Sequence, residues 1–242
     1  MNIYAPDYYP EFHCIASKCR HTCCAGWEID IDPDSLARYD RLPGDFGERV
    51  RAGIERGDTP HFILTEGERC PLLTGDNLCA LMLHEGEDAL CQICQDHPRF
   101  RNFFSSRVEI GLGLVCEEAA RLILSFPHPL RLIRLEGDDE ETLTEDERYL
   151  FELRSRWISS IREEGPAARL METLIYRHLP DALYDGRLDA RIGFIRRAYA
   201  EIISDWTDGR LTTLIECARR FSDRVEYDDE VLESYLDTYG AL

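Results

Sequence analysis

Four of the ten cysteines lie in one short stretch, CIASKCRHTCCAG, which spans Cys14 to Gly26. Two of them, Cys23 and Cys24, are adjacent. The stretch is too irregular for a long helix, so we expect turns that present the thiols. Cysteines crowded on turns are not typical of core packing, in which a free cysteine behaves as a small hydrophobe. The cysteines of this stretch are therefore expected to have a role other than core packing.

The other cysteines extend this pattern along the first half of the chain. Cys91 and Cys94 form a Cys-x2-Cys pair, whereas the remaining gaps between cysteines are irregular. Cys217 stands apart in LIECARRF, on an apolar helical stripe, and we expect it to be an ordinary core residue. The sequence-based candidates for metal ligands are Cys14, Cys19, Cys23, Cys24, Cys70, Cys79, Cys91, Cys94 and Cys116.

The cellular compartment decides between disulfides and metal. The N-terminus, MNIYAPDYYPEF, has neither the basic segment nor the apolar segment of a secretory signal, so we expect a cytoplasmic protein. Disulfides are rare in a reducing cytosol, where clustered thiols usually bind metal or act in catalysis. We therefore predict a metal site, and leave open which four thiols would hold it.

The kind of metal stays open between an iron–sulfur cluster and zinc. A zinc site often has two Cys-x2-Cys pairs, but only one is present here, and the known ferredoxin spacings are absent as well. The Cys-x3-Cys-x2-Cys motif of radical enzymes is also missing, because Gly26 and Glu87 stand at the positions that would complete it. His13, His21 and His97 lie near the thiols, but without a paired-histidine ligand motif we expect ordinary roles for them.

Charge and hydropathy exclude several classes of partner. The net charge of −19 argues against binding nucleic acid, because phosphates are repelled by such a surface, and it disfavours anionic lipid. The absence of any apolar run of about 18 residues predicts no membrane span. A lysine-bearing partner would be attracted, although plain solubility explains the charge equally well.

Hydrophobic periodicity predicts a mainly helical protein with a small irregular α+β cysteine-rich region and a C-terminal helical bundle. We expect a metal-binding region over residues 1–125 and a helical region over 126–242 packed against it. Short strands are predicted at 26–32, 61–67 and 107–116, and two short helices after Asp32, a candidate cap. A helix is predicted from 117, and a capping box at Thr144 and Glu147 starts another over 145–164. Further helices are predicted at 166–184, 188–206, 210–221 and 229–239.

Three segments resemble a known family. YYPEFHCIASKCRHTCCAGWEIDID (residues 8–32), CPLLTGDNLCALMLHEGEDALCQICQDHPR (residues 70–99) and GLGLVCEEAARLIL (residues 111–124) are similar to the flagellin lysine-N-methylase (FliB-like) family. A more distant resemblance is to cysteine-rich zinc- or iron-chelating domains. The chain is shorter than the family leads us to expect, and His97 stands where the family more often has an aromatic residue.

The resemblance implies methyl transfer from S-adenosylmethionine to lysine ε-amines of flagellin, in a protein associated with an iron–sulfur cluster, with 4Fe-4S as the expected form. It maps the family's thiols onto the nine cysteines named above. A carboxylate or tyrosine would have to accept the proton of the lysine. The sequence assigns no catalytic residue and no donor-binding motif; residues available near the thiols are Asp7, Tyr8, Tyr9, Trp27 and Glu28. The alternative is a non-catalytic metal-binding or redox-sensing module.

Overall fold

The structure, a computed structural model, describes residues 1–240 and divides the chain into two compact units. The cysteine-rich unit comprises Cys14–His97, and the helical unit comprises Met1–His13 together with the chain from Pro98 onward. The unit boundaries therefore fall at 13/14 and 97/98, whereas we had expected one boundary after residue 125. The first thirteen residues belong to the helical unit, and the cysteine-rich unit is an insertion in it.

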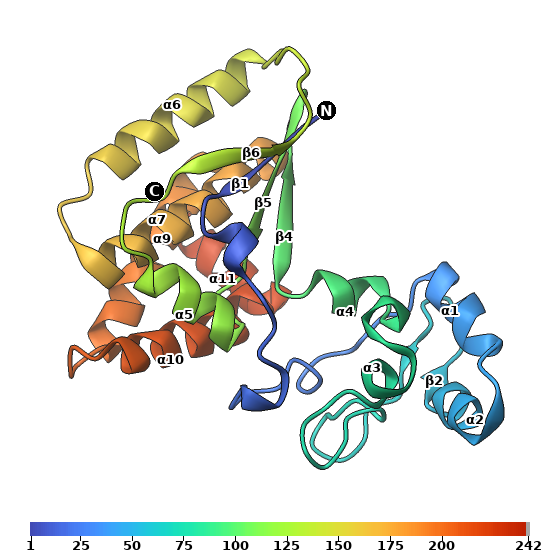
Figure 1. Cartoon of the computed structure of the whole chain (residues 1–242). Coiled ribbons are helices and arrows are strands. Elements are labelled where there is room, and N and C mark those ends of the chain that lie inside the picture. Colours follow the sequence, from blue (N-terminus) through green and yellow to red (C-terminus); the bar gives the residue numbers. More distant parts are fainter. Residues whose placement is uncertain (241–242) are drawn as a thin grey trace. The chain divides into compact units, whose positions relative to one another are not determined.

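A four-stranded sheet organises the helical unit. Its strand order is β4 (Arg99–Phe103), β5 (Arg107–Leu112), β1 (Asn2–Pro6) and β6 (Leu132–Glu136), as Figure 1 shows. β1 pairs in parallel with β5 and antiparallel with β6, and β4 and β5 form an antiparallel hairpin. The N-terminal strand is thus an inner strand, with a neighbour on each side.

A close contact explains one glycine of this sheet. Phe100 of β4 lies opposite Gly111 of β5, and a Cβ on Gly111 would come within 2.3 Å of the Phe100 ring. That space is filled by the aromatic ring, which also packs at 5.9 Å from the ring of Tyr176. Any side chain at position 111 would displace Phe100.

Helices supply most of the core of the helical unit (Figure 1). Their bounds are α5 (Glu117–Ser125), α6 (Glu145–Ser159), α7 (Gly165–His178), α8 (Ala182–Asp185), α9 (Leu188–Asp205), α10 (Leu211–Phe221) and α11 (Asp229–Gly240). A π-helical turn, Ser222–Glu226, follows α10. Fully buried residues such as Ile175, Phe194 and Ala218 come from three different helices, so these amphipathic faces share one core.

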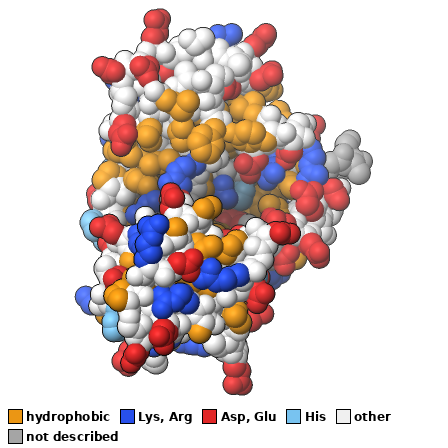
Figure 2. Space-filling model, turned by 90° about the vertical axis from the view of Figure 1, so that its right-hand side faces the viewer, with side chains coloured by type: hydrophobic (Ala, Val, Ile, Leu, Met, Phe, Trp, Pro, Cys, Tyr) orange, Lys and Arg blue, Asp and Glu red, His pale blue; other side chains and the backbone are white. Residues whose placement is uncertain are grey.

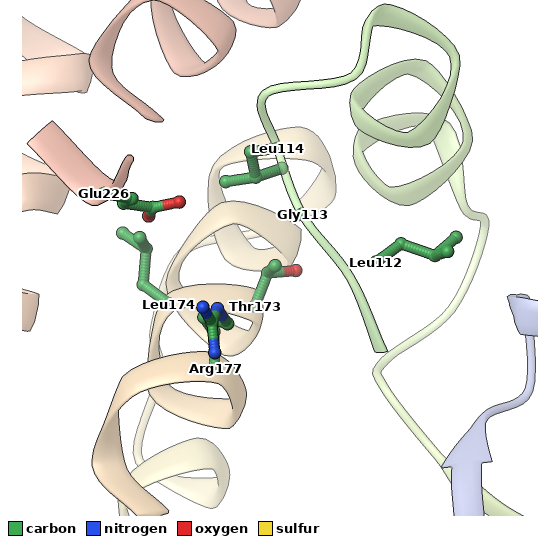
Figure 3. A pocket seen from close by; sticks show the side chains of 7 residues that line it. All are labelled: Leu112, Gly113, Leu114, Thr173, Leu174, Arg177 and Glu226. Carbon is green, nitrogen blue, oxygen red and sulfur yellow. The ribbon is translucent and has the colours of Figure 1, made fainter. Parts of the chain in front are cut away.

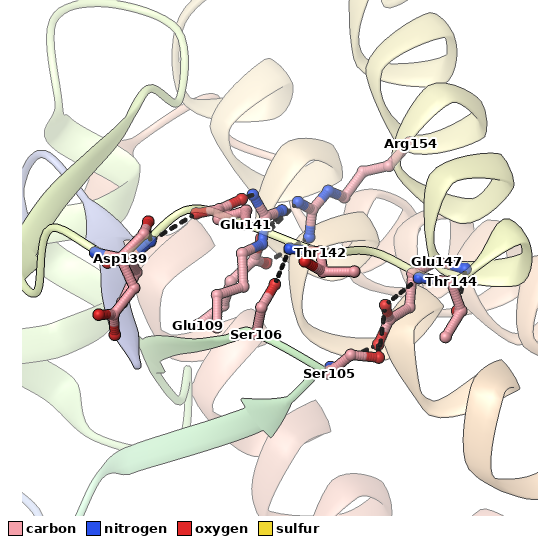
Figure 4. A network of polar contacts seen from close by, with 11 residues as sticks. Ser105, Ser106, Glu109, Asp139, Glu141, Thr142, Thr144, Glu147 and Arg154 are labelled. Carbon is pink, nitrogen blue, oxygen red and sulfur yellow. Dashed lines mark hydrogen bonds and ion pairs between the residues drawn. The ribbon is translucent and has the colours of Figure 1, made fainter.

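A buried ion pair ties the sheet to α6. Glu109 of β5 has no exposed surface and accepts two hydrogen bonds from the guanidinium of Arg154, at 2.5 and 2.8 Å. Arg107, on the same strand, also donates to Glu109. Figure 4 shows this pair beside the cap of α6, where Thr144 and Glu147 bond each other's backbone and Glu147 also accepts from Ser105. A buried carboxylate is tolerated because two guanidinium groups satisfy it.

The cysteine-rich unit contains short elements around a smaller core. They are α1 (Pro33–Asp40), α2 (Gly44–Ala52), β2 (Ile54–Glu55), β3 (His61–Phe62), α3 (Ala80–Glu85) and α4 (Gln92–Asp96). Tyr39 is its largest fully buried side chain, and its ring packs at 6.0 Å from that of Phe62. Much of the remaining chain is held by turns and isolated bridges.

Several expectations about the elements are confirmed. The protein is mainly helical and has a small sheet, the helices after Asp32 and at 117 exist, and the capping box at Thr144 is present. The strand predicted over 26–32 is wrong: this segment makes only one isolated bridge, at Asp30.

Two predicted helices are also shorter than expected. α6 ends at Ser159, before the Gly165-Pro166 pair. The helix predicted over 166–184 is interrupted by a 3-10 turn at Leu179–Asp181, because Pro180 cannot donate the next helical hydrogen bond. The strands β4 and β6 were not predicted at all.

The surface and the helices bear on possible partners. On the face drawn in Figure 2, acidic and basic side chains are interspersed with apolar ones, so the negative net charge does not make this face uniformly acidic. Among residues 1–240, no helix combines the length and the apolar character needed to span a bilayer.

The buried ion pair gives a first prediction. Replacing Arg154 by Met should lower the free energy of unfolding by about 3 kcal/mol, because Glu109 stays buried and loses its bidentate partner. Chemical denaturation of the whole chain, followed by circular dichroism, measures this change. Arg156→Met is the matched control, since Arg156 is exposed on the same helix. Equal effects of the two substitutions would contradict the importance of the buried pair.

Candidate metal centre

The Cys-x2-Cys pair adopts a geometry suited to binding one metal. Cys91 precedes the short helix α4, and its carbonyl oxygen accepts hydrogen bonds from the backbone N–H groups of Cys94 and Gln95, both at 3.0 Å. This turn brings the two Sγ atoms to 3.5 Å. Two thiolates on one tetrahedral metal, each about 2.3 Å from it, would be about 3.8 Å apart. The pair therefore needs almost no rearrangement to chelate a metal.

Backbone pairing brings three further cysteines together. The N–H of Cys70 donates to the carbonyl of Cys24 at 2.8 Å, and an isolated bridge joins Leu73 to Cys79. Burial raises the pKa of Cys70 to about 12, and repulsion from the thiolates of Cys24, Cys79 and Cys91 adds to the increase. These interactions show that the three segments carrying these thiols are neighbours.

The adjacent pair Cys23 and Cys24 belongs to the same neighbourhood. A hydrogen bond from Cys23 lowers the pKa of Cys24 to about 7, against the opposing effect of burial. The pKa of Cys94 is raised by its hydrogen bond to Cys91 and by burial, and the charges of Cys24 and Cys23 act in the same direction. Six of the nine predicted thiols thus interact electrostatically within the cysteine-rich unit. They are Cys23, Cys24, Cys70, Cys79, Cys91 and Cys94.

The other three predicted ligands differ in their surroundings. Cys14 and Cys19 belong to the cysteine-rich unit; Cys14 is exposed and accepts a hydrogen bond from the N–H of Ala16, and Cys19 is half-buried. Cys116 belongs to the helical unit, where it stands at the N-cap position of α5. Cys217 is buried on α10, as expected for a core residue.

The donor chemistry fits a thiolate-bound metal, but the ligand set is not closed. None of the ten cysteines, all within the described residues, forms a disulfide. Within residues 1–240, no three or more His, Cys, Asp or Glu side chains already surround a single point at which an ion could sit. Soft thiolates are the donors that zinc and iron–sulfur clusters take. The neighbouring thiols would have to move closer together to complete a ligand set.

Helix α1 holds the segment that leads into the Cys-x2-Cys pair. The Asp32 carboxylate accepts from the N–H of Ser35 at 2.9 Å, which caps α1, and from the N–H of Gln92 at 2.8 Å, which caps α4. The buried Tyr39 hydroxyl donates to the carbonyl of Ala89 at 2.9 Å, and Arg38 donates to that of Asp88. We call these three side chains the α1 clamp.

The sequence indicated only one part of the α1 clamp, which is the cap of α1 by Asp32. Asp32 before Pro33 is a recognisable helix cap, but its bond to Gln92 joins residues 60 positions apart. Burial tends to raise the pKa of Asp32, yet the hydrogen bonds from Gln92 and Ser35 outweigh it and hold the pKa below its usual value. No local pattern marks Tyr39 or Arg38 as partners of residues 88–89.

The acidic and aromatic candidates fall into both units. In the cysteine-rich unit, Trp27 stacks on His97 with ring centroids 6.1 Å apart, and its indole N–H donates to the carbonyl of Cys23 at 2.8 Å. Glu28 is exposed and lies 3.4 Å from His61. In the helical unit, Tyr8 is buried in the core. Trp27 is therefore the candidate that lies beside the thiols, and His97 stacks on it.

A cavity in the helical unit is too small for a substrate. Its volume is about 10 Å³, which is room for one water molecule. Figure 3 shows the side chains that line it: Leu112, Gly113, Leu114, Thr173, Leu174, Arg177 and Glu226. Glu226 is held in place because it pairs with Nε2 of His178 at 2.9 Å and accepts from the Ser222 hydroxyl at 2.6 Å. These bonds give Glu226 a structural role in the π-helical turn.

Comparison with known proteins identifies the relatives of this chain. Two lysine-N-methylases, of Salmonella choleraesuis (strain SC-B67) and Salmonella typhimurium (strain LT2), are each 29% identical to it over 146 residues, which is 54% of this chain and 35% of each relative. The flagellar biosynthetic protein FliU of Salmonella muenchen is 26% identical over 140 residues, which is 54% of this chain and 82% of that protein. No protein-family model and no solved structure matches.

These relatives place the chain among proteins similar to lysine-N-methylases. They confirm the expected resemblance to the flagellin lysine-N-methylase (FliB-like) family. The chain spans about a third of the length of the lysine-N-methylases that it matches.

The α1 clamp gives the second prediction. Asp32→Ala should lower the free energy of unfolding of the cysteine-rich unit by about 1–3 kcal/mol, because two helices lose their cap. Hydrogen-exchange mass spectrometry of the metal-free protein should show lost protection over residues 88–97. Asp34→Ala, an exposed change in the same helical turn, should leave that segment protected.

The effect of Asp32→Ala should also depend on pH in one direction. The folded-state pKa of Asp32 is depressed, so its stabilising effect is complete above its unfolded pKa of about 3.9 and is lost as the pH falls through the folded value. The difference between wild type and Asp32→Ala should therefore shrink below about pH 4. A difference that grew on acidification would contradict the assigned hydrogen bonds.

Proposed function

We propose that this protein is a FliB-like lysine methylase that transfers a methyl group from S-adenosylmethionine to lysine ε-amines of flagellin. The observation that carries the proposal is the similarity to lysine-N-methylases in a chain that places eight cysteines in one unit. In the transfer, the bond between the donor sulfur and its methyl group breaks as the lysine nitrogen forms a bond to that methyl. The lysine first gives up a proton, since only the neutral amine attacks.

An iron–sulfur cluster, with a 4Fe-4S cluster as the expected form and zinc as the alternative, belongs to the proposal. Cys91 and Cys94 would supply two ligands, and the others would come from Cys23, Cys24, Cys70 and Cys79. When bound, the group would cross-link three segments that the polypeptide alone joins only by turns. The α1 clamp would keep the Cys91–Cys94 turn in position for it.

The partner in this proposal is flagellin, or another protein that presents surface lysines. The net charge of −19 favours encounter with a lysine-bearing surface and disfavours nucleic acid. The reaction would take place in the cytoplasm, where both the donor and newly made substrate are present and where thiols stay reduced.

A second function is favoured by the sequence, which combines clustered thiols with no recognised donor-binding motif. The protein would then be a non-catalytic metal-binding or redox-sensing module.

The third prediction concerns the metal. Protein purified without oxygen should be brown and contain iron and acid-labile sulfide, because thiolates from the cysteine-rich unit would hold a cluster. The double substitution of Cys91 and Cys94 by Ser should abolish the metal content. Cys217→Ser is the matched control and should retain it, since Cys217 is a core residue of α10. Zinc without sulfide would replace the cluster with a zinc site, and retention of metal by the double variant would contradict the ligand assignment.

The fourth prediction concerns activity. Flagellin co-expressed with this protein should gain methyl groups of 14 Da each, on the order of one to three per modified lysine, because the ε-amine can be methylated up to three times. Intact-mass and peptide mass spectrometry measure the gain, and purified components should require S-adenosylmethionine. Metal-loaded, donor-supplied protein that methylates no lysine would favour the non-catalytic module instead.

A further inference from the structure

The basic side chains of this protein are almost all of one kind. Of its 28 lysine and arginine residues, 27 are arginines, and Lys18 is the only lysine. A guanidinium is always protonated and has no electron pair with which to attack a methyl group, whereas the ε-amine of lysine is a target of methylation. Under the proposed function, the chain therefore carries its positive charge on side chains that are not its substrate, with a single exception.

Lys18 is presented at the surface by a tight turn. It is the last residue of a 3-10 turn, Ala16–Lys18, in the cysteine-rich unit. Its N–H donates to the carbonyl of Ile15, and the N–H of Cys19 donates to the carbonyl of Ala16, both at 3.0 Å. Ala16 has a φ of 48°, in the left-handed region that residues with a Cβ rarely adopt. The turn fixes the backbone and leaves the lysine side chain exposed.

The ammonium group of Lys18 has no carboxylate partner. Within residues 1–240 it forms no ion pair, whereas the exposed Arg121 and the buried Arg154 each pair with a glutamate. The surrounding sequence explains the difference, because residues 12–27 contain no Asp or Glu in a chain that has 47 of them. No ion pair has to break before this side chain enters another site, as the lysine of a substrate protein must do.

The position of Lys18 makes it a competitor of any other substrate. Cys24, one of the proposed metal ligands, follows it by six positions, so the two Cα atoms are at most about 22 Å apart. A lysine in the same chain as a reaction centre meets that centre at an effective concentration that a separate protein rarely reaches. An unmodified Lys18 would therefore compete with the substrate, and a fully methylated one would not.

We infer that Lys18 is itself methylated by this protein. The inference rests on the proposed methylase function and adds a modification site to it. In each transfer, the ε-nitrogen of Lys18 forms a bond to the methyl carbon, and the bond from that carbon to the donor sulfur breaks. The electron pair of the broken bond stays on the sulfur of S-adenosylhomocysteine, and a proton passes from the nitrogen to water. Methylation keeps the positive charge, so the electrostatics of the segment do not change.

The experiment measures the mass of the protein itself. The whole chain, isolated from cells that make no flagellin, should be heavier than its sequence by about 14 Da per methyl group, with up to three groups. Peptide mass spectrometry should place them on Lys18. Lys18→Arg keeps the charge and should show no gain in mass, and it should still methylate flagellin. Because Lys18 is exposed, this variant should fold as the wild type does, which circular dichroism checks.

A matched control tests whether the position matters. Arg210→Lys, made in the Lys18→Arg variant, introduces a lysine where the native side chain is 79% exposed, in the helical unit. It should gain less than about a tenth of the methyl groups that Lys18 gains, because it lacks the short connection to the thiols. Equal modification of both positions would overturn the assignment to the thiol-bearing segment.

Flagellin, supplied with S-adenosylmethionine to the same purified protein, separates this inference from the proposed function. Methylated flagellin together with an unmodified Lys18 would overturn the inference and leave the proposed function intact. A mass gain that persisted in Lys18→Arg would place the modification on another residue and would also overturn it. Absence of methyl groups from both flagellin and Lys18 would overturn both proposals.

Discussion

The parallel pairing of β1 with β5 is the constraint on which the rest of the structure depends. It places residues 2–6 inside a sheet whose other strands all come after residue 98. The chain therefore leaves the sheet after β1 and returns to it only after residues 14–97. The cysteine-rich unit lies within the connection between β1 and the later strands. Its two ends join the helical unit in the sequence at 13/14 and 97/98.

The two units are stabilised by different physical means. The helical unit has a large apolar core from α5, α7, α9 and α10, and its buried charges are paired, as Glu109 is with Arg154. The core of the cysteine-rich unit is about half that size in residues, and much of its chain is in turns. A small core supplies little net stability, so cross-links through thiolates and the α1 clamp would matter most there.

This division bears on how a methylase could be built from such a chain. Eight of the nine candidate thiols and the stacked pair Trp27 and His97 lie in the cysteine-rich unit. Methyl transfer needs the donor and the amine to be held in line. The two lysine-N-methylases, which are longer than this chain, are the natural comparison for that requirement.

The sequence by itself determined the helical character, the caps at Asp32 and Thr144, the core role of Cys217 and the family resemblance, because these depend on local spacing and residue type. Only the tertiary structure decided that residues 1–13 join the second half of the chain, that Cys116 belongs to a different unit from the other candidate thiols, and that Asp32 caps α4 as well as α1. β6 was missed because its partner β1 lies at the other end of the chain, and hydrogen bonds between residues far apart in sequence leave no local pattern. β4 pairs with its neighbour β5, but its polar Asn102 is buried and its Phe103 is exposed, so residue type did not mark it as a strand.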